Sequence, residues 1–206
     1  MERVISYIDG LNLYFGLRSR GWRRFYWLDL QRLSAALLKP GQSLEHVKYF
    51  TSRISFSPSD PNRVRRQNAF LEATATLPRT SLFFGHYLSK PVQCRKCGAT
   101  WVKQEEKMTD VNIALELLAD AQEDRYDVAL LVSADSDLTG PVVKVRTLFP
   151  RKRVIVAFPP DRVSERLKRE ANGWINIGAD SIRQNQLPDP VAKPDGVRPW
   201  KPVEWR

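Results

Sequence analysis

The clearest buried strand in this chain is Val128-Ala129-Leu130-Leu131-Val132, and it leads directly into Ser133-Ala134-Asp135-Ser136-Asp137. An uninterrupted apolar run bounded by short polar residues is typical of a strand buried on both faces of a parallel sheet. A second such run, Val4-Ile5-Ser6-Tyr7-Ile8, ends at Asp9. The carboxyl ends of parallel strands share one edge of a sheet, so we expect these aspartates to lie near one another.

Strands and helices alternate along most of the chain. The apolar patterns predict strands over 3–8, 45–54, 81–88, 127–132, 153–158 and 174–177. Between them, a helix capped by Asp29 is expected, with others over 62–76, 141–149 and 162–171. One further helix is predicted from an apolar stripe made of Val111, Ala114, Leu115 and Leu118. This alternation favours an α/β fold with a mostly parallel sheet covered on both faces.

The domain organisation follows from where the pattern stops. A length of 206 residues suits one domain. We assign residues 1–183 to that domain, with an insertion of about 89–104 that has a hairpin-like sequence. Residues 184–206 contain several prolines and little apolar periodicity, which predicts an extended or disordered tail.

Composition limits the class of protein. The net charge of +10 favours a polyanionic partner, and nucleic acid is the common one. Two cysteines do not make a disulfide framework. No apolar run approaches the ~20 residues needed to span a bilayer, and the chain opens directly into a strand. We therefore expect a cytoplasmic protein without a membrane partner.

Four aspartates form the candidate catalytic and metal-binding set: Asp9, Asp110, Asp135 and Asp137. Hard divalent cations prefer oxygen ligands, so this set predicts a Mg²⁺ or Mn²⁺ centre. Asn12 and Ser133 are expected to support it by hydrogen bonding. Asp110 has an alternative role, because a carboxylate at a helix start also acts as a cap.

Three segments that carry these residues resemble the motifs of NYN domains in the PIN-like ribonuclease superfamily. They are Tyr7-Ile8-Asp9-Gly10-Leu11-Asn12-Leu13, Glu106-Lys107-Met108-Thr109-Asp110-Val111-Asn112-Ile113-Ala114 and Leu131-Val132-Ser133-Ala134-Asp135-Ser136-Asp137-Leu138. The resemblance implies a Rossmann-like (PIN-like) three-layer sandwich, a Mg²⁺ or Mn²⁺ centre and RNA cleavage. It also places Lys107 in the family's usual basic position before the helix aspartate. Ala134 and Leu138 replace a common glycine and a common aromatic residue.

A basic and aromatic segment between residues 18 and 27 is the main candidate for RNA binding. Its proposed contacts are Arg18, Arg20, Trp22, Arg23 and Arg24. Arginines bind phosphates, and exposed aromatic rings stack on unpaired bases. The alternative is that Trp22, Phe25 and Trp27 belong to the core while the arginines are merely solvated. Two other basic runs are secondary candidates: one contains Arg63, Arg65 and Arg66, and the other is Arg151-Lys152-Arg153.

Cys94-Arg95-Lys96-Cys97-Gly98 resembles one knuckle of a zinc ribbon. A structural Zn²⁺ needs four ligands, and the chain has no second cysteine pair. His86 is the candidate third ligand. The alternative is two reduced thiols in a turn.

The leading hypothesis is therefore a Mg²⁺- or Mn²⁺-dependent endoribonuclease that hydrolyses RNA phosphodiester bonds. A catalytically weak or inactive RNA-binding or regulatory module is the second hypothesis. The third is a metal-dependent phosphatase with Asp9 as nucleophile. That chemistry usually wants an aspartate two residues later, and position 11 is leucine.

Overall fold

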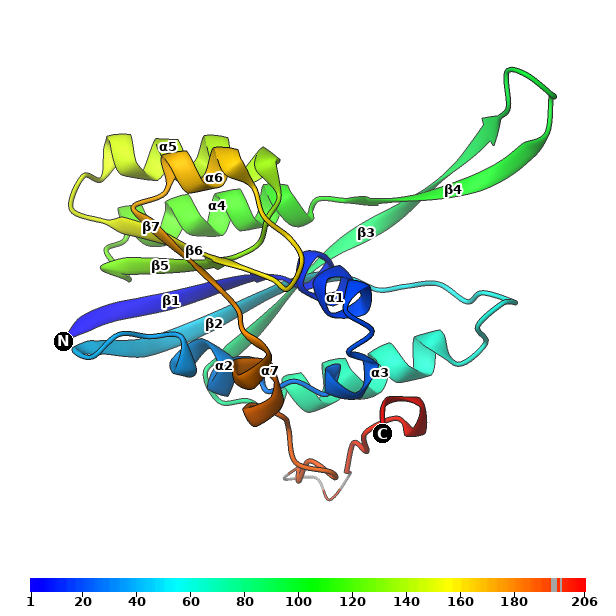
Figure 1. Ribbon diagram of the computed structural model, residues 1–206, viewed down its shortest axis with the longest axis horizontal. Coiled ribbons are helices and arrows are strands. Elements are labelled where there is room, and N and C mark those ends of the chain that lie inside the picture. Colours follow the sequence, from blue (N-terminus) through cyan, green and yellow to red (C-terminus); the bar gives the residue numbers. More distant parts are fainter. Residues whose placement is uncertain (194–195, 197) are drawn as a thin grey trace.

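A central sheet runs through the whole molecule (Figure 1). The computed structural model describes residues 1–193, 196 and 198–206, without the side chains of residues 103 and 104. The strands are β1 (Glu2–Asp9), β2 (Gln42–Ser52), β3 (Thr80–Gln93), β4 (Thr100–Lys107), β5 (Val128–Val132), β6 (Arg153–Phe158) and β7 (Gly173–Asn176). Their order is β4-β3-β2-β1-β5-β6-β7. All neighbours are parallel except β3 and β4, which form an antiparallel hairpin.

Helices cover both faces of this sheet (Figure 1). Helices α1 (Gly10–Ser19), α2 (Leu30–Ala36), α3 (Arg63–Thr74) and α7 (Ala179–Gln184) share one apolar cluster with the sheet. Helices α4 (Thr109–Gln122), α5 (Thr139–Leu148) and α6 (Glu165–Glu170) share the other. Three short 3₁₀ turns are η1 (Arg23–Phe25), η2 (Ser136–Leu138) and η3 (Val203–Trp205). Within the described residues, no helix has both the length and the apolar character to cross a membrane.

The two aspartate-bearing strands are neighbours at the centre of the sheet. Val4 of β1 pairs with Val128 of β5, and the register continues to Ile8 opposite Val132. Every residue of β5 is buried, as is β1 from Val4 onward. The parallel register brings the carboxyl ends of both strands to the same edge, as the sequence predicts.

The buried face of α4 differs from the predicted stripe. Ile113, Leu117 and Ala121 are the apolar residues that α4 buries, whereas Val111 and Leu115 are 48% and 60% exposed. Each fully buried leucine or isoleucine contributes about 1.5–3 kcal/mol through removal from water. The predicted stripe is therefore wrong at Val111 and Leu115, whereas Leu118 packs partly buried against the core. Apolar residues occur on more than one side of this helix.

A buried polar network also holds α4 against the sheet. The Lys48 ammonium of β2 lies 2.5 Å from Glu116 Oε2 and 2.5 Å from Asp120 Oδ2. The Tyr7 hydroxyl of β1 donates a hydrogen bond of 2.6 Å to the same Asp120 oxygen. A buried charge is tolerated only when it is paired, so these contacts constrain the position of α4 on the sheet. They thereby constrain Asp110 in its first turn.

The predicted insertion is the outer part of the β3–β4 hairpin. This hairpin extends away from the body of the molecule, and the Cys94–Gly98 segment lies at its turn (Figure 1). Phe84, Leu88, Trp101 and Val102 of the hairpin are exposed.

The segment after residue 184 has little helix or strand, yet much of it packs on the domain. The Leu187 N–H donates to Trp27 O at 2.9 Å, and the Trp27 indole donates to Pro188 O at 2.9 Å. Trp205 is only 8% exposed and joins an apolar cluster with Trp27 and Val191. Residues 194, 195 and 197 of the predicted tail lie outside the described residues.

Candidate active site

Asp9 ends β1 and is almost fully buried, at 4% exposure. Its Oδ1 accepts a hydrogen bond of 2.9 Å from the Asn12 N–H, so Asp9 caps α1. Its Oδ2 accepts a second bond of 2.9 Å from the Ser133 hydroxyl. Burial is the main cause that raises the pKa of Asp9 to about 6, because the hydrogen bonds only partly offset desolvation.

Ser133 connects the ends of β1 and β5. While its hydroxyl donates to Asp9, its oxygen accepts a hydrogen bond of 3.0 Å from the Asp135 N–H. Asp135 Oδ1 in turn accepts a bond of 3.0 Å from the Asp137 N–H and caps η2. Ser133 was predicted to support the site by hydrogen bonding. In the structure it hydrogen-bonds both Asp9 at the end of β1 and the backbone of Asp135 after β5.

Asp110 does not act as a side-chain cap. The residue before α4 is Met108, in the left-handed region at φ 78°, and no side-chain cap hydrogen bond is present. Burial raises the pKa of Asp110 to about 7, and the charges of Asp9, Asp135, Glu106 and Asp137 add to the shift. All four predicted aspartates thus share one electrostatic environment, in which ionised carboxylates repel one another.

The donor set matches the chemistry of a hard divalent cation. Carboxylate oxygens are the ligands that Mg²⁺ and Mn²⁺ prefer, and a cation would offset the burial and the repulsion that raise these pKa values. Among the residues that the structure describes, no three histidine, cysteine or acidic side chains meet closely enough to hold an ion. Binding would therefore require the carboxylates to draw together, or water and phosphate oxygens to complete the shell.

Two residues at this edge escaped the sequence predictions. Glu106 Oε1 accepts a hydrogen bond of 2.7 Å from the Ser52 hydroxyl and another from Thr109 Oγ1. Arg162 Nε donates a bond of 2.9 Å to Asn12 Oδ1. Arg162 follows β6, so the strand-end argument that selected Asp9 and Asp135 also applies to it. Glu106 is part of the quoted motif, but its proximity depends on the β3–β4 pairing.

Lys107 lies beside the acidic edge, but its ammonium group pairs with Glu105 rather than with one of the four aspartates. Its Nζ is 3.1 Å from Glu105 Oε2 on the same strand, and the side chain is 44% exposed. No contact links it to the aspartates within the described part of the chain.

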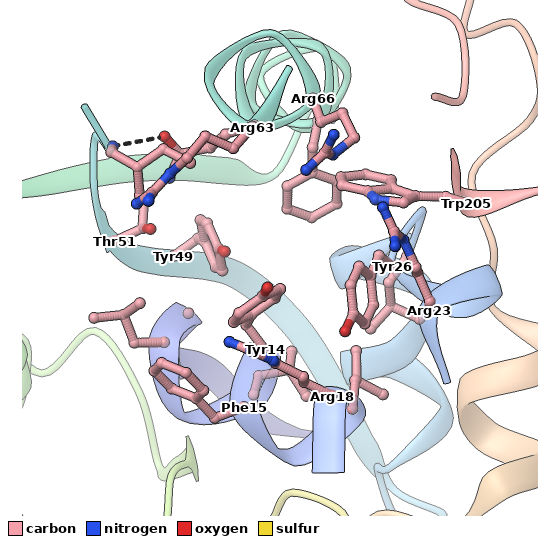
Figure 2. A pocket seen from close by; sticks show the side chains of 18 of the residues that line it. Tyr14, Phe15, Arg18, Arg23, Tyr26, Tyr49, Thr51, Arg63, Arg66 and Trp205 are labelled. Carbon is pink, nitrogen blue, oxygen red and sulfur yellow. Dashed lines mark hydrogen bonds between the residues drawn. The ribbon is translucent and has the colours of Figure 1, made fainter. Parts of the chain in front are cut away.

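The basic and aromatic segment divides into two groups. Arg18 and Arg23 line a cavity of about 700 Å³ between α1, α3, β2 and the C-terminal residues (Figure 2). Arg20 instead pairs with Asp161 at 2.6 Å, and Arg24 lies over the Phe25 ring. Trp22 is half-buried against the core, and Trp27 is fully buried. The core alternative is therefore correct for Trp27 and partly correct for Trp22.

The zinc candidates are not brought together. Cys94 and Cys97 lie at the hairpin turn, whereas His86 pairs with Lys107 at the opposite end of the two strands. His86 and Cys94 are separated by an extended strand, which spans roughly 3.3 Å per residue. His86 is therefore too distant to be the third ligand. Backbone N–H groups of Cys97 and Lys96 lower the pKa of Cys94.

Comparison with known proteins agrees with this architecture. One solved structure, a protein of unknown function named VPA0982 from Vibrio parahaemolyticus RIMD 2210633, superposes with a TM-score of 0.55. It has 20% sequence identity, and the match covers 87% of this chain and 94% of that one, which establishes a shared fold.

A curated relative is 6-hydroxy-3-succinoylpyridine 3-monooxygenase HspA from Pseudomonas putida (strain DSM 28022 / S16). It is 30% identical over 70% of this chain, and the match spans 55% of that protein's length. The sequence model of the NYN domain matches residues 3–178, which include all four aspartates. This match over most of the chain shows that the protein belongs to the NYN domain family.

Proposed function

We propose that this protein is a Mg²⁺- or Mn²⁺-dependent ribonuclease that hydrolyses phosphodiester bonds at the acidic edge. The observation that carries the proposal is that Asp9, Asp110 and Asp135, from three separate elements, lie within electrostatic range of one another, with Ser133 joining two of them. Membership of the NYN family, a nuclease-type family, supports the same activity.

The four aspartates, Asp9, Asp110, Asp135 and Asp137, would hold the cation. When bound, it supplies an activated water and stabilises charge on the attacking and leaving oxygens. Ser133 keeps the Asp9 carboxylate oriented, and Asn12 keeps Arg162 beside the site. The Arg162 guanidinium is then placed to bind a substrate phosphate. Water attack leaves a 5′-phosphate and a 3′-hydroxyl and does not require the RNA 2′-hydroxyl.

The test is cleavage of labelled RNA by purified protein with Mn²⁺ or with EDTA. The parent should cleave only with the metal. Asp9→Asn and Asp135→Asn should each lose at least about a hundredfold in rate, as expected when charge stabilisation at the reacting phosphate is removed. Both variants should keep the circular dichroism spectrum of the parent. Cleavage at the parental rate by both variants would contradict the assignment.

A second function competes because the cavity of about 700 Å³ could admit a small aromatic acid. The relative from Pseudomonas putida is named for action on 6-hydroxy-3-succinoylpyridine. Incubation of this protein with that compound, oxygen and a reductant distinguishes the two. Turnover of the pyridine without any RNA cleavage would favour the second function. RNA binding without cleavage would instead favour the regulatory-module hypothesis.

A further inference from the structure

The cavity beside the acidic edge combines arginines with aromatic rings. Its walls come from α1, α3, β2, η1 and the C-terminal residues (Figure 2). Figure 2 shows Tyr14 and Arg63 extending into it from opposite sides, with Tyr49 on the strand between them. A volume of about 700 Å³ lies within the range of small-ligand sites.

Within the described part of the chain, three of its four arginines have no ion-pair partner. Arg66 contacts Asp60, and its Nη1 lies 3.2 Å from Glu204 Oε1, so its charge is already compensated. The guanidinium groups of Arg18, Arg23 and Arg63 form no direct ion pair with any residue that the structure describes, although the Asp60 carboxylate, which also lines the cavity, is influenced by the charges of Arg23 and Arg63. Like charges held near one cavity repel one another, so an anionic group inside it would be attracted.

The aromatic rings are arranged as a partly exposed surface. The Tyr14 and Tyr26 ring centroids are 5.1 Å apart, and Tyr26 contacts Trp205 at 5.5 Å. Tyr14 is 39% exposed although it lines the cavity, whereas Trp205 is 8% exposed. Exposed tyrosine rings next to arginines are the features with which proteins stack unpaired bases.

The cavity lies next to the acidic edge, although none of the four aspartates lines it. Gly10, which lines the cavity, directly follows Asp9 in the chain. An added Cβ at Gly10 would lie 2.6 Å from the Tyr49 ring, so backbone and ring are in close contact. Tyr87 also lines the cavity, and the charge of Glu106 adds to burial in raising the Tyr87 pKa.

We propose that this cavity binds one nucleotide of the RNA next to the bond that is cleaved. The base would stack on Tyr14, and its phosphate would pair with Arg63. Arg18 and Arg23, on other sides of the cavity, would attract the neighbouring phosphates of the strand. This inference rests on the proposed ribonuclease function. The ligand that these residues would recognise is a flat aromatic ring carrying an anionic group. A nucleotide and a small aromatic acid have both features in common.

Binding is measured separately from cleavage. Fluorescence anisotropy of a labelled single-stranded RNA is recorded with Asp135→Asn protein in EDTA at fixed ionic strength. In that background, Arg63→Ala and Tyr14→Ala should each weaken binding about fivefold or more. Arg65→Ala is the matched control, because it removes the same charge from the same helix outside the cavity. It should change the Kd less than about twofold.

An abasic scan then locates the base. A single abasic nucleotide at one position should weaken RNA binding as much as Tyr14→Ala does. Combining this abasic RNA with the Tyr14→Ala protein should weaken binding no further than either change alone. Uridine or adenosine 5′-monophosphate should displace the RNA, and inorganic phosphate at equal ionic strength should not.

Three results would overturn the assignment: equal losses for Arg63→Ala and Arg65→Ala, additive losses at every abasic position, or displacement by 6-hydroxy-3-succinoylpyridine but not by mononucleotides. Because the assay measures binding alone, any of these results would reject the nucleotide site even if the parent cleaves RNA. Conversely, if Arg63→Ala and Tyr14→Ala weaken binding selectively but the parent never cleaves RNA, the nucleotide site stands and the ribonuclease function is rejected.

Discussion

The amide oxygen of Asn12 accepts a hydrogen bond of 3.0 Å from the backbone N–H of Ala134. The same oxygen accepts a second bond of 2.9 Å from Arg162 Nε. Asn12 is 5% exposed and lies in the first turn of α1, whereas its partners follow β5 and β6. One side chain therefore links the start of α1 to the two loops that follow β5 and β6.

Two replacements of Asn12 test separately its contribution to stability and its effect on the charge near Asp9. Asn12→Ala leaves the partly buried Ala134 N–H without its Asn12 partner, at a cost of about 1–3 kcal/mol. For a domain of this size, that is a fall in Tm of about 2–12 °C. Asn12→Asp keeps an acceptor but adds a negative charge near Asp9, so the Asp9 pKa should rise and the pH–rate profile should move to higher pH. An unchanged profile in Asn12→Asp would contradict the electrostatic coupling.

Ser133→Ala tests the bridge between the two strand ends. Loss of the hydroxyl removes a hydrogen bond that lowers the Asp9 pKa, so this pKa should rise above about 6. Cleavage in limiting Mn²⁺ should then need higher pH, because protons compete with the metal for the carboxylate. Ser6→Ala is the control, since Ser6 is equally buried on β1 but bonds Ser34 at 2.9 Å. A similar pH shift in both variants would reject the specific role of Ser133.

Asp110→Asn should stabilise the metal-free protein at pH 8. The Asp110 pKa is about 7 in the folded protein and 3.8 in its ordinary state. Between these values the folded state binds more protons, so its stability falls as pH rises, and the penalty is complete above pH 7. The Tm of the variant in EDTA should exceed that of the parent by a few degrees at pH 8 and not at pH 4.

Mn²⁺ should reverse this difference, because it binds the ionised parent site more strongly. A helix start favours negative charge by about 0.3–1 kcal/mol. If Asp110→Asn were less stable than the parent at pH 8 in EDTA, that helix effect would outweigh the repulsion among carboxylates.

Gly10→Ala should destabilise the protein, because the new Cβ would lie 2.6 Å from the Tyr49 ring and 2.7 Å from Phe50 O. Overpacking of this kind costs about 1–3 kcal/mol. Gly140→Ala is the same substitution in helix α5 with no atom within 4 Å of its Cβ. It should raise stability by about 0.4–1 kcal/mol. Urea titrations of both variants measure the change in the free energy of unfolding. If Gly140→Ala lowered it as much as Gly10→Ala does, crowding around the new Cβ would not explain the destabilisation at Gly10.

Trp205→Ala tests whether the C-terminal segment is part of the folded domain. The Trp205 ring packs on Tyr26, Trp27 and Phe70 at centroid distances of 5.5–6.4 Å. Its loss should cost about 3 kcal/mol. Trp200→Ala, at a side chain that is 57% exposed, should cost less than about 0.5 kcal/mol. Equal Tm values for the two variants would indicate that the Trp205 packing contributes nothing to stability.

The strands and the strand-end aspartates were predictable because their signals are local. An apolar run such as Val128–Val132 followed by polar residues specifies a buried strand and its end. The face of α4 was not predictable in this way. Val111 and Leu115 are as apolar as Ile113 and Leu117, so only packing against β1 and β5 selects which pair is buried.

Residue type and spacing along the chain sufficed to predict Asp9, Asp110, Asp135 and Asp137 as one candidate set, because each follows a recognisable strand end or opens a helix. The cavity is different, because its walls come from distant parts of the chain: Tyr14 lies near the N-terminus, Arg63 in α3 and Trp205 at the C-terminus. The tertiary structure also decides which arginine charges are neutralised by an ion pair. Arg66 meets both Asp60 and Glu204 only after α3 and the last residues of the chain pack together. Contacts of such high sequence separation leave no periodic signal, and only the tertiary structure brings them into one site.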